Sequence, residues 1–458
     1  MNHLVTIIGH ARTGSNYLCK LIEESFPDVV SHYELFNKQK CHINLDYKEK
    51  LESHYKTDKL HLVAARNPLE FMDTIIKLSD KDIESVVKVL KSDFITQGPI
   101  TIEFEKKVAK YCGAKYAHAV NSATSALHIA CLSLGVKEGD YVWTSPISFV
   151  ASSNCALYCG AKVDFVDIDP VSYNMSINAL EEKLIKAKKK KCLPKVIIPV
   201  HLSGQSCEMQ KIHELSKVYG FKIIEDASHA IGGKYKGETI GNCKYSDIAV
   251  FSFHPVKIIT TCEGGMCTTN DRKISNLLAR YRSHGITRHS EEMKKAPDGP
   301  WYYEQLDLGY NYRLNDIMAS LGISQLNRVD EFVSKRNKIA KKYDSLFKDS
   351  DIRTQVILSD NYSSRHLYII RVRENSTYNQ KMLFEKYRAL GIWVNLHYIP
   401  IYKQPYYSKM GFDFKDYPNA EKYYKEAISI PIFPSLKEDD QIRIVDIVNK
   451  PLGYQNLF

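Results

Sequence analysis

Apolar positions in the middle of this chain follow two different periods. Between residue 115 and about residue 271, short apolar runs bounded by turn residues alternate with stretches in which apolar residues recur every three or four positions. The short runs predict buried strands, and the stretches between them predict helices. The predicted strands are residues 116–120, 141–144, 162–167, 195–200, 222–225 and 247–253. This alternation predicts an α/β fold, with a mostly parallel sheet covered by helices on both faces.

Helical patterns flank this region. Ser79 and Asp82 have the spacing of a capping box, and the apolar residues after them fall on one helical face. Past Phe332 the apolar spacing predicts a long helix, followed by shorter strands and helices to the end of the chain. We therefore predict a large domain over residues 77–330 and a small C-terminal α/β domain over residues 331–458.

The first 76 residues form a separate pattern, and the composition shifts near residue 77. An apolar run at residues 4–8, a Gly/Ser-rich turn at residues 9–16 and a helix start at Tyr17 predict a strand, a loop and a helix. Such a unit can bind phosphate through backbone amides at the start of its helix. Polar side chains available to assist are Arg12, Thr13 and Ser15. Residues 1–76 are thus predicted to be an extra short α/β segment.

Composition narrows the class of protein. Hydrophobic residues make up 44% of the chain and charged residues 25%, which is typical of a soluble globular protein. The net charge of +10 comes from scattered lysines, apart from a run at residues 186–191 that we expect on an exposed helix end. A phosphate-rich substrate is an adequate partner for such a surface, so we expect no nucleic acid.

Two further features concern location and metals. The 11 cysteines have irregular spacings without a zinc-type pair, so we expect reduced thiols and no metal site. The apolar start at residues 4–8 is too short, and is broken too soon by Gly9, to be a signal peptide or a membrane span. The expected location is the cytoplasm, without membrane association.

The first candidate for chemistry is Lys257. An apolar strand ends at His254 and Pro255, and the lysine follows on a short loop before the turn at Gly264 and Gly265. Partial burial lowers the pKa of a lysine amine, and the neutral amine can then attack a carbonyl and hold an aldehyde as a Schiff base. A lysine after a strand is often only a solvated loop residue, so the surrounding pattern has to decide.

Asp226 supplies a matching acid. It ends the apolar run 222–225 and is followed by small residues, as expected at the carboxyl end of a buried parallel strand. A carboxylate there can keep the ring nitrogen of pyridoxal phosphate protonated, which this cofactor needs in order to withdraw electrons. Asp226 and Lys257 would then form a functional pair.

A phosphate cradle is predicted upstream. Residues 117–130 form a short strand that turns through small residues into an Ala/Leu-rich helix, whose first N–H groups are free to bind phosphate. Ser252 could add a hydroxyl. Phe149 could stack on a cofactor ring or simply begin a helix in the core. His229 could be a functional residue or a satisfied core histidine.

Taken together, these stretches resemble one enzyme family. The similar segments, in the family's order across residues 79–458, are 90–99, 121–126, 225–229, 252–257, 263–265, 309–314 and 397–400. They resemble a DegT/DnrJ-type nucleotide-sugar aminotransferase, a pyridoxal-phosphate enzyme of the aspartate-aminotransferase fold (fold type I). The resemblance implies a large domain with a seven-stranded type of sheet, a small C-terminal domain and a homodimer with shared active sites.

The resemblance also implies roles for single residues. Lys257 would bind pyridoxal phosphate and act as the base and acid of the reaction, Asp226 would pair with the ring nitrogen, and Phe149 would stack on the ring. The remaining implied cofactor contacts are Ala123, Thr124 and Ser252 with the phosphate, His229 with the phenolic oxygen, and Asn311 with the phosphate of the neighbouring subunit. His397 and Tyr402 resemble residues of the segment that closes over the sugar nucleotide, although both could instead serve a structural hinge.

The predicted reaction is transfer of an amino group from an amino acid, L-glutamate in our prediction, to C4 of a 4-keto-6-deoxy nucleotide sugar. Ser228, His229 and the segment 397–402 most resemble the pseudaminic-acid branch, which implies UDP-2-acetamido-2,6-dideoxy-β-L-arabino-hex-4-ulose as substrate for polysaccharide biosynthesis. Another 4-keto sugar, such as the GDP-4-keto-6-deoxymannose of perosamine synthesis, stays open.

Two other classes of function stay open as well. Residues 9–16 and 62–68, with Thr74, resemble the nucleotide-binding motifs of sulfotransferases, but the chain before residue 77 is much shorter than those enzymes. A non-catalytic cofactor-binding regulator is the other alternative. Lys257 argues against it, and also against the related dehydrating enzymes, which carry histidine at that position.

Overall fold

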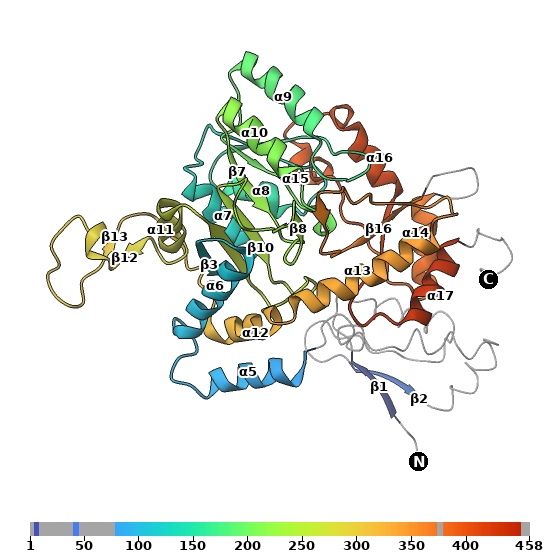
Figure 1. Cartoon of the computed structure of the whole chain (residues 1–458), viewed down its shortest axis with the longest axis horizontal. Coiled ribbons are helices and arrows are strands. Elements are labelled where there is room, and N and C mark those ends of the chain that lie inside the picture. The colour runs from blue at the N-terminus through green and yellow to red at the C-terminus, as the bar shows by residue number, and fades with distance from the viewer. Residues whose placement is uncertain (1–3, 9–39, 45–77, 373–378, 450–458) are drawn as a thin grey trace. The chain divides into compact units, whose positions relative to one another are not determined.

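The computed structural model describes residues 4–8, 40–44, 78–372 and 379–449. The chain divides into two compact units, Met1–Lys77 and Leu78–Phe458 (Figure 1). In the first unit, β1 (Leu4–Ile8) pairs antiparallel with β2 (Lys40–Asn44). The strand predicted at residues 4–8 is present. The predictions for residues 9–17, residues 62–68 and Thr74 lie outside the described residues.

The second unit is built on a seven-stranded sheet with the order β3-β11-β10-β7-β6-β4-β5. β11 is antiparallel to both of its neighbours, and the other neighbouring pairs are parallel, so the predicted mostly parallel sheet is confirmed. The strands are β3 (Tyr116–Val120), β4 (Tyr141–Thr144), β5 (Lys162–Phe165), β6 (Val196–Ile198), β7 (Lys222–Asp226), β10 (Ile248–Ser252) and β11 (Gly265–Thr269).

Apolar side chains on both faces of this sheet explain its burial. Along β6, Val196 and Ile198 point into one hydrophobic cluster, while Ile197 between them points into another. Ile223 and Ile224 on β7 divide between the same two clusters. Strand residues alternate between faces, so both faces must be covered.

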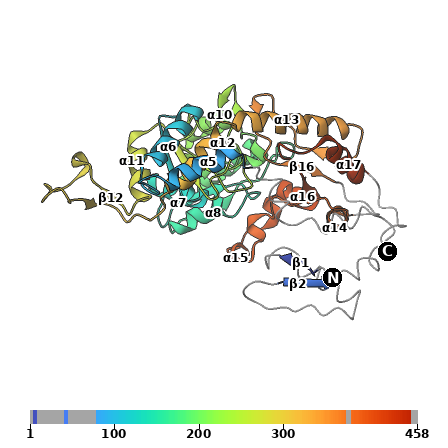
Figure 2. The same ribbon diagram turned by 90° about the horizontal axis from the view of Figure 1, so that it is seen from below.

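Helices cover the two faces in separate sets (Figures 1 and 2). The cluster on one face contains residues of α7 (Ala123–Ser133), α8 (Ala151–Tyr158) and α11 (Arg272–Tyr281). The other face is covered by α9 (Ile177–Lys190) and α10 (Met209–Tyr219), together with a cluster contributed by α6 (Pro99–Cys112), α12 (Asp316–Leu326) and α13 (Val329–Leu346). The lysine run at residues 186–191 is exposed on the end of α9, apart from the alanine within it, as predicted.

The capping box predicted at Ser79 begins α5 (Asp80–Leu90). The Ser79 hydroxyl accepts from the Asp82 N–H, and the Asp82 carboxylate accepts from the Ser79 N–H at 2.8 Å. Asp82 is fully buried and also accepts hydrogen bonds from Gln325 and Arg328. The same carboxylate therefore caps α5 and fastens it to the end of α12.

The C-terminal part follows the long helix α13, which begins three residues before Phe332. A three-stranded antiparallel sheet of β14 (Arg353–Thr354), β16 (Tyr368–Arg371) and β17 (Ala427–Ile430) packs with α13, α14 (Gln380–Ala389) and α17 (Glu438–Asn449) around its own hydrophobic cluster. The remaining helices are η4 (Ile401–Lys403), α15 (Pro405–Ser408), η5 (Phe414–Asp416) and α16 (Pro418–Glu426).

Smaller elements complete the unit. β12 (Ile286–Thr287) and β13 (Glu304–Gln305) form an arm that projects from the body in both views (Figures 1 and 2). The others are η2 (Leu202–Gly204), η3 (Ser290–Glu292) and the sheet of β8 (Lys234–Tyr235), β9 (Glu238–Thr239) and β15 (Asn361–Tyr362). Within the described ranges, no helix is long and apolar enough to cross a membrane.

Candidate active site

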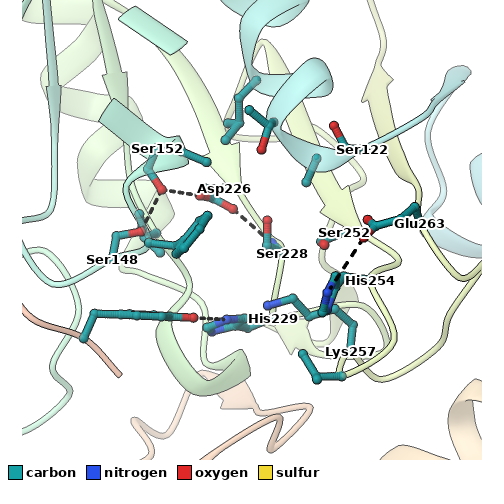
Figure 3. Close-up of a pocket in the computed structure, with 18 residues that line it drawn as sticks. Ser122, Ser148, Ser152, Asp226, Ser228, His229, Ser252, His254, Lys257 and Glu263 are labelled. Carbon is teal, nitrogen blue, oxygen red and sulfur yellow. Dashed lines mark hydrogen bonds and ion pairs between the residues drawn. The ribbon is translucent and has the colours of Figure 1, made fainter. Parts of the chain in front are cut away.

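A cavity of about 360 Å³ lies where β7 and β10 end and α7 begins (Figure 3). This is the edge at which ligands bind to parallel sheets. Seven of the predicted site residues line it: Ala123, Thr124, Phe149, Asp226, His229, Ser252 and Lys257. The structure thus brings together these seven residues from four separate stretches of the sequence.

Lys257 points its amine into this cavity from the loop after β10 (Figure 3). The loop is a tight turn in which the Lys257 N–H donates to the His254 carbonyl at 2.9 Å. Burial lowers the pKa of the Lys257 amine to about 8, although the negative charge of Asp226 acts in the opposite direction. A larger fraction of this amine than of a free lysine is therefore neutral near physiological pH, and the neutral form is the nucleophile.

Asp226 ends β7 and is held by two donors. The Ser152 hydroxyl donates to Oδ2 at 2.6 Å, and the Ser228 N–H donates to Oδ1 at 3.1 Å. Ser148 extends this chain through a 2.7 Å hydrogen bond between its hydroxyl and that of Ser152. These two hydrogen bonds hold the carboxyl group of Asp226 in place, facing the cavity.

The start of α7 forms the cradle predicted for a phosphate. Ser122 caps the helix by accepting from the Ser125 N–H, which leaves the N–H groups of Ala123 and Thr124 in the first turn, where no intrahelical acceptor exists. Gly265 on β11 permits the close packing behind this turn. A Cβ added at Gly265 would lie 2.6 Å from the backbone nitrogen of Ala123.

Three aromatic side chains, those of His229, Tyr398 and Phe149, form another part of the cavity wall. A hydrogen bond of 3.1 Å joins His229 Nε2 and the hydroxyl of Tyr398, and the ring of His229 lies 4.4 Å from that of His366. Burial, and secondarily the positive charge of Lys257, lowers the pKa of His229 well below its usual value, so the imidazole is neutral. Phe149 is 59% exposed, with its ring centre 6.2 Å from that of Tyr398, which places it on the cavity wall.

Three predicted residues do not line this cavity. Asn311 is exposed and pairs through its backbone with Ser283, so its predicted contact with a neighbouring subunit stays a prediction. His397 is half-buried and hydrogen-bonded through Nδ1 to the Ser429 hydroxyl at 2.9 Å; burial, with Lys257, lowers its pKa to about 4. Tyr402 is buried in a hydrophobic cluster. Substrate binding by the last two also stays a prediction.

Other lining residues were missed by sequence reasoning. Ser152 stands three positions after Phe149 in a run of small residues, a weak signal that becomes specific only once α8 is placed beside β7. Tyr398 directly follows His397 in a segment that the sequence did single out. His254 and Glu263 stand at either end of the lysine loop, with 3.9 Å between His254 Nε2 and Glu263 Oε1.

The donor set fits pyridoxal phosphate. Backbone N–H groups of α7 and the Ser252 hydroxyl suit a phosphate, and the anchored carboxylate of Asp226 suits a protonated ring nitrogen. The amine of Lys257 suits the aldehyde. In addition, the buried Nδ1 of His229 has no hydrogen-bond partner among the described residues, so a polar atom remains available to a ligand.

Comparison with known proteins gives a consistent result. The model of the DegT/DnrJ/EryC1/StrS aminotransferase family matches residues 77–449. The UDP-4-amino-4,6-dideoxy-N-acetyl-beta-L-altrosamine transaminase of Campylobacter jejuni subsp. jejuni serotype O:23/36 (strain 81-176) is 38% identical over 364 residues, which cover 79% of this chain and 92% of the relative. Residues 1–76 lie outside the family match.

Solved structures of aminotransferases are similar to this chain as well. Helicobacter pylori PseC, an aminotransferase involved in the biosynthesis of pseudoaminic acid, has a TM-score of 0.73 and 32% identity, covering 81% of this chain and 96% of that one. The putative sugar aminotransferase Spr1654 from Streptococcus pneumoniae, in its PMP-form, has a TM-score of 0.74 and 30% identity over the same shares, and its PLP-form is also similar.

These findings confirm the predicted fold, the predicted enzyme class and, through the PLP-form and PMP-form of Spr1654, the predicted cofactor of such enzymes. The family match covers far more than half of the sequence, and the cavity holds the lysine and the aspartate on which the resemblance rested. The chain belongs to the DegT/DnrJ/EryC1/StrS aminotransferase family.

Proposed function

We propose that this chain transfers an amino group from L-glutamate to C4 of a 4-keto-6-deoxy nucleotide sugar. The proposed acceptor is UDP-2-acetamido-2,6-dideoxy-β-L-arabino-hex-4-ulose, in a pathway to a cell-surface sugar of the pseudaminic-acid type. The observation that carries the reaction class is the single cavity in which the low-pKa amine of Lys257, the anchored carboxylate of Asp226 and the first turn of α7 converge.

Each residue of the site has a separate role in the proposed reaction. When bound, pyridoxal phosphate withdraws electrons from the substrate carbon that loses its proton, provided that its ring nitrogen is protonated. Asp226 keeps that nitrogen protonated, and Ala123, Thr124 and Ser252 hold the phosphate. Lys257 Nζ removes the α-proton of the amino-acid donor and, in the second half-reaction, returns a proton to C4 of the sugar.

The choice of sugar has separate support. The Campylobacter jejuni relative is named for an altrosamine derivative, and Helicobacter pylori PseC acts in pseudoaminic-acid biosynthesis. His397 and Tyr402 are the proposed substrate residues, and Tyr398 and His229 lie on the adjacent cavity wall. A site built to pair a given polar group rejects analogues lacking it more strongly than an apolar wall does.

The test is a substrate panel. The purified protein is incubated with pyridoxal phosphate, glutamate and either the UDP-acetamido 4-keto sugar or GDP-4-keto-6-deoxymannose, and the products are read by mass spectrometry. We expect efficient amination of the UDP sugar alone. More efficient amination of the GDP sugar would refute the branch while leaving the reaction class intact.

A Lys257→Ala variant tests the reaction class itself. It should lose turnover with every sugar and should lack the absorption band of lysine-bound cofactor. A Lys273→Ala variant, which changes a lysine at the start of α11 outside the cavity, is the matched control and should keep both properties. Turnover by the Lys257 variant at the wild-type rate would overturn the assignment.

We also propose a homodimer in which Asn311 of each subunit completes the other subunit's site. The exposed position of Asn311 allows such a contact. Mixing Lys257→Ala and Asn311→Ala subunits tests it, because each mixed dimer regains one site with both residues. Activity above that of either variant alone is the expected result, and no gain would refute the sharing.

A further inference from the structure

A second hollow, about 530 Å³ in volume, lies between α8 and the segment that forms α15. The two helices lie side by side in both views of the molecule (Figures 1 and 2). One face of α8 forms the first wall of this hollow, and α15 with the residue before it forms the second. We call it the side groove, and the residues that characterise its lining are Asn154, Leu157, Tyr158, Gln404, Tyr406 and Tyr407.

The side groove continues outward from the active-site cavity. Phe149 lines the cavity, and the residues of α8 that follow it in the chain line the groove. Tyr398 lines the cavity in the same way, and α15 follows it in the chain. These two segments are joined, because the Ile401 N–H donates to the Pro146 carbonyl at 2.9 Å. They therefore form one trough, with the cavity at one end and the side groove at the other.

The length of this trough suits a nucleotide sugar. Ser152 lines the cavity and Tyr158 lines the side groove, and both residues lie on α8. The six positions between them span about 9 Å along the helix axis. In a nucleotide sugar, a diphosphate and a ribose separate the hexose from the base and bridge a gap of this size. With the hexose in the cavity, the base reaches the side groove.

Exposed tyrosines give the side groove surfaces on which a base can stack. Tyr158 is 53% exposed and Tyr406 is 64% exposed, whereas Tyr407 between the two walls is buried. The ring of Tyr406 is supported by that of Tyr407, with centroids 5.6 Å apart and an interplanar angle of 74°. A planar base stacks well on such rings, because both partners present flat π-faces.

Amide side chains supply hydrogen bonds for the edge of a base. The Tyr407 hydroxyl donates to Asn154 Oδ1 and accepts from the Ser153 hydroxyl at 2.7 Å, which fixes the Asn154 side chain and joins α15 to α8. Within the described part of the chain, the Nδ2 hydrogens of Asn154 and the side-chain amide of Gln404 have no hydrogen-bond partner. The edge of a uracil ring presents two carbonyl oxygens and one N–H, which amide groups can pair.

We propose that the side groove binds the base of the nucleotide sugar, with Tyr406 as its stacking surface and Asn154 and Gln404 as its polar partners. The base is uracil in the proposed substrate, so this inference rests on the proposed function. A base held there adds affinity without touching the reacting atoms. Loss of this contact should therefore raise KM for the sugar and leave the reaction with glutamate unchanged.

The test measures the binding of UDP and of GDP to the full-length holoenzyme by calorimetry. We expect UDP to bind, and we expect Tyr406→Ala to weaken its binding about tenfold, while Tyr406→Phe, which keeps the ring, stays within about twofold of the wild type. Gln404→Ala should also weaken it. Tyr362→Ala is the matched control and should change nothing, because Tyr362 is 41% exposed on β15 and lines neither hollow. Nucleotide binding that is unchanged in both Tyr406→Ala and Gln404→Ala would overturn the proposal.

The same measurements separate the base site from the identity of the sugar. Binding of GDP in place of UDP, still weakened by Tyr406→Ala, would keep the side groove as the base site and refute the proposed UDP sugar. Size-exclusion chromatography tests another occupant: a Tyr406→Ala variant that dissociates into monomers with unchanged nucleotide affinity would make the groove a contact between copies. A slower reaction of Tyr406→Ala with glutamate would place Tyr406 in the cavity itself. Either result would overturn the proposal.

Discussion

Burying the amine of Lys257 should cost the apoprotein stability, and the size of that cost follows from its pKa. The pKa falls from 10.5 to about 8 on folding. At about 1.4 kcal/mol per pKa unit, the cost at pH 7 is at most about 3 kcal/mol, and the half-buried position of the side chain brings the expected value nearer to about 2 kcal/mol. Lys257→Met keeps a long side chain without the charge, so this variant should be more stable than the wild type by that amount.

The pH dependence separates this cause from better packing. Because the folded-state pKa lies below the unfolded value, the unfolded chain binds more protons between pH 8 and pH 10.5, and wild-type stability rises with pH through that window. Lys257→Met should therefore exceed the wild type in free energy of unfolding by at most about 3 kcal/mol at pH 7, and by at most about 1.4 kcal/mol at pH 9.5.

Denaturant unfolding of the two apoproteins at both pH values measures this difference. Lys273→Met is the matched control, because its side chain lies at the exposed start of α11. It should change stability by less than about 0.5 kcal/mol at either pH. If Lys257→Met raised the free energy of unfolding equally at both pH values, burial of the charged amine would not be the cause, and the reasoning would be refuted.

Three further changes test the support around the site. Gly265→Ala places a Cβ 2.6 Å from the Ala123 nitrogen and should weaken cofactor binding, measured by titration with pyridoxal phosphate, by about 1–3 kcal/mol of overpacking. Ser152→Ala removes the donor to Asp226 and should lower turnover up to about tenfold, equal to about one lost hydrogen bond; an unchanged rate would contradict the positioning role. Asp82→Ala removes a helix cap and an ion pair, and should lower the free energy of unfolding by about 2–3 kcal/mol, measured with denaturant.

The sequence predicted the central sheet well because its strands are apolar on both faces. Residues 116–120 and 141–144 form strands with the predicted bounds, the run 222–225 extends by one residue to Asp226, and the other three predicted runs contain shorter strands. β11 was missed, since Gly265 follows another glycine and reads as part of a turn. Its strand conformation comes from pairing with the preceding strand β10 on one side and, on the other, with β3, which is distant in the sequence.

The site was predictable to the extent that it lies at strand ends. Asp226 and Ser252 are the last residues of the parallel strands β7 and β10, and Lys257 follows β10. Such strand ends meet at one edge of the sheet regardless of the helices between them. The contact between His229 and Tyr398 joins residues 169 positions apart, and the donation by Ser152 depends on how α8 is rotated over β7. Neither the rotation of a helix nor the docking of the C-terminal residues can be read from local spacing.

The segment 397–402 shows how this limit affects the substrate prediction. The hydroxyl of Tyr402 donates to Glu421 at 2.8 Å, and its ring stacks on Tyr417 with centroids 4.8 Å apart. Donation of this hydroxyl to a substrate would first have to break that hydrogen bond, at a cost of about 1 kcal/mol. The hydroxyl of Tyr398 is hydrogen-bonded as well, to His229, but it already lies at the cavity wall. In this conformation Tyr398 is therefore the tyrosine of the segment that is better placed to meet a ligand, while Tyr402 anchors the segment that carries it.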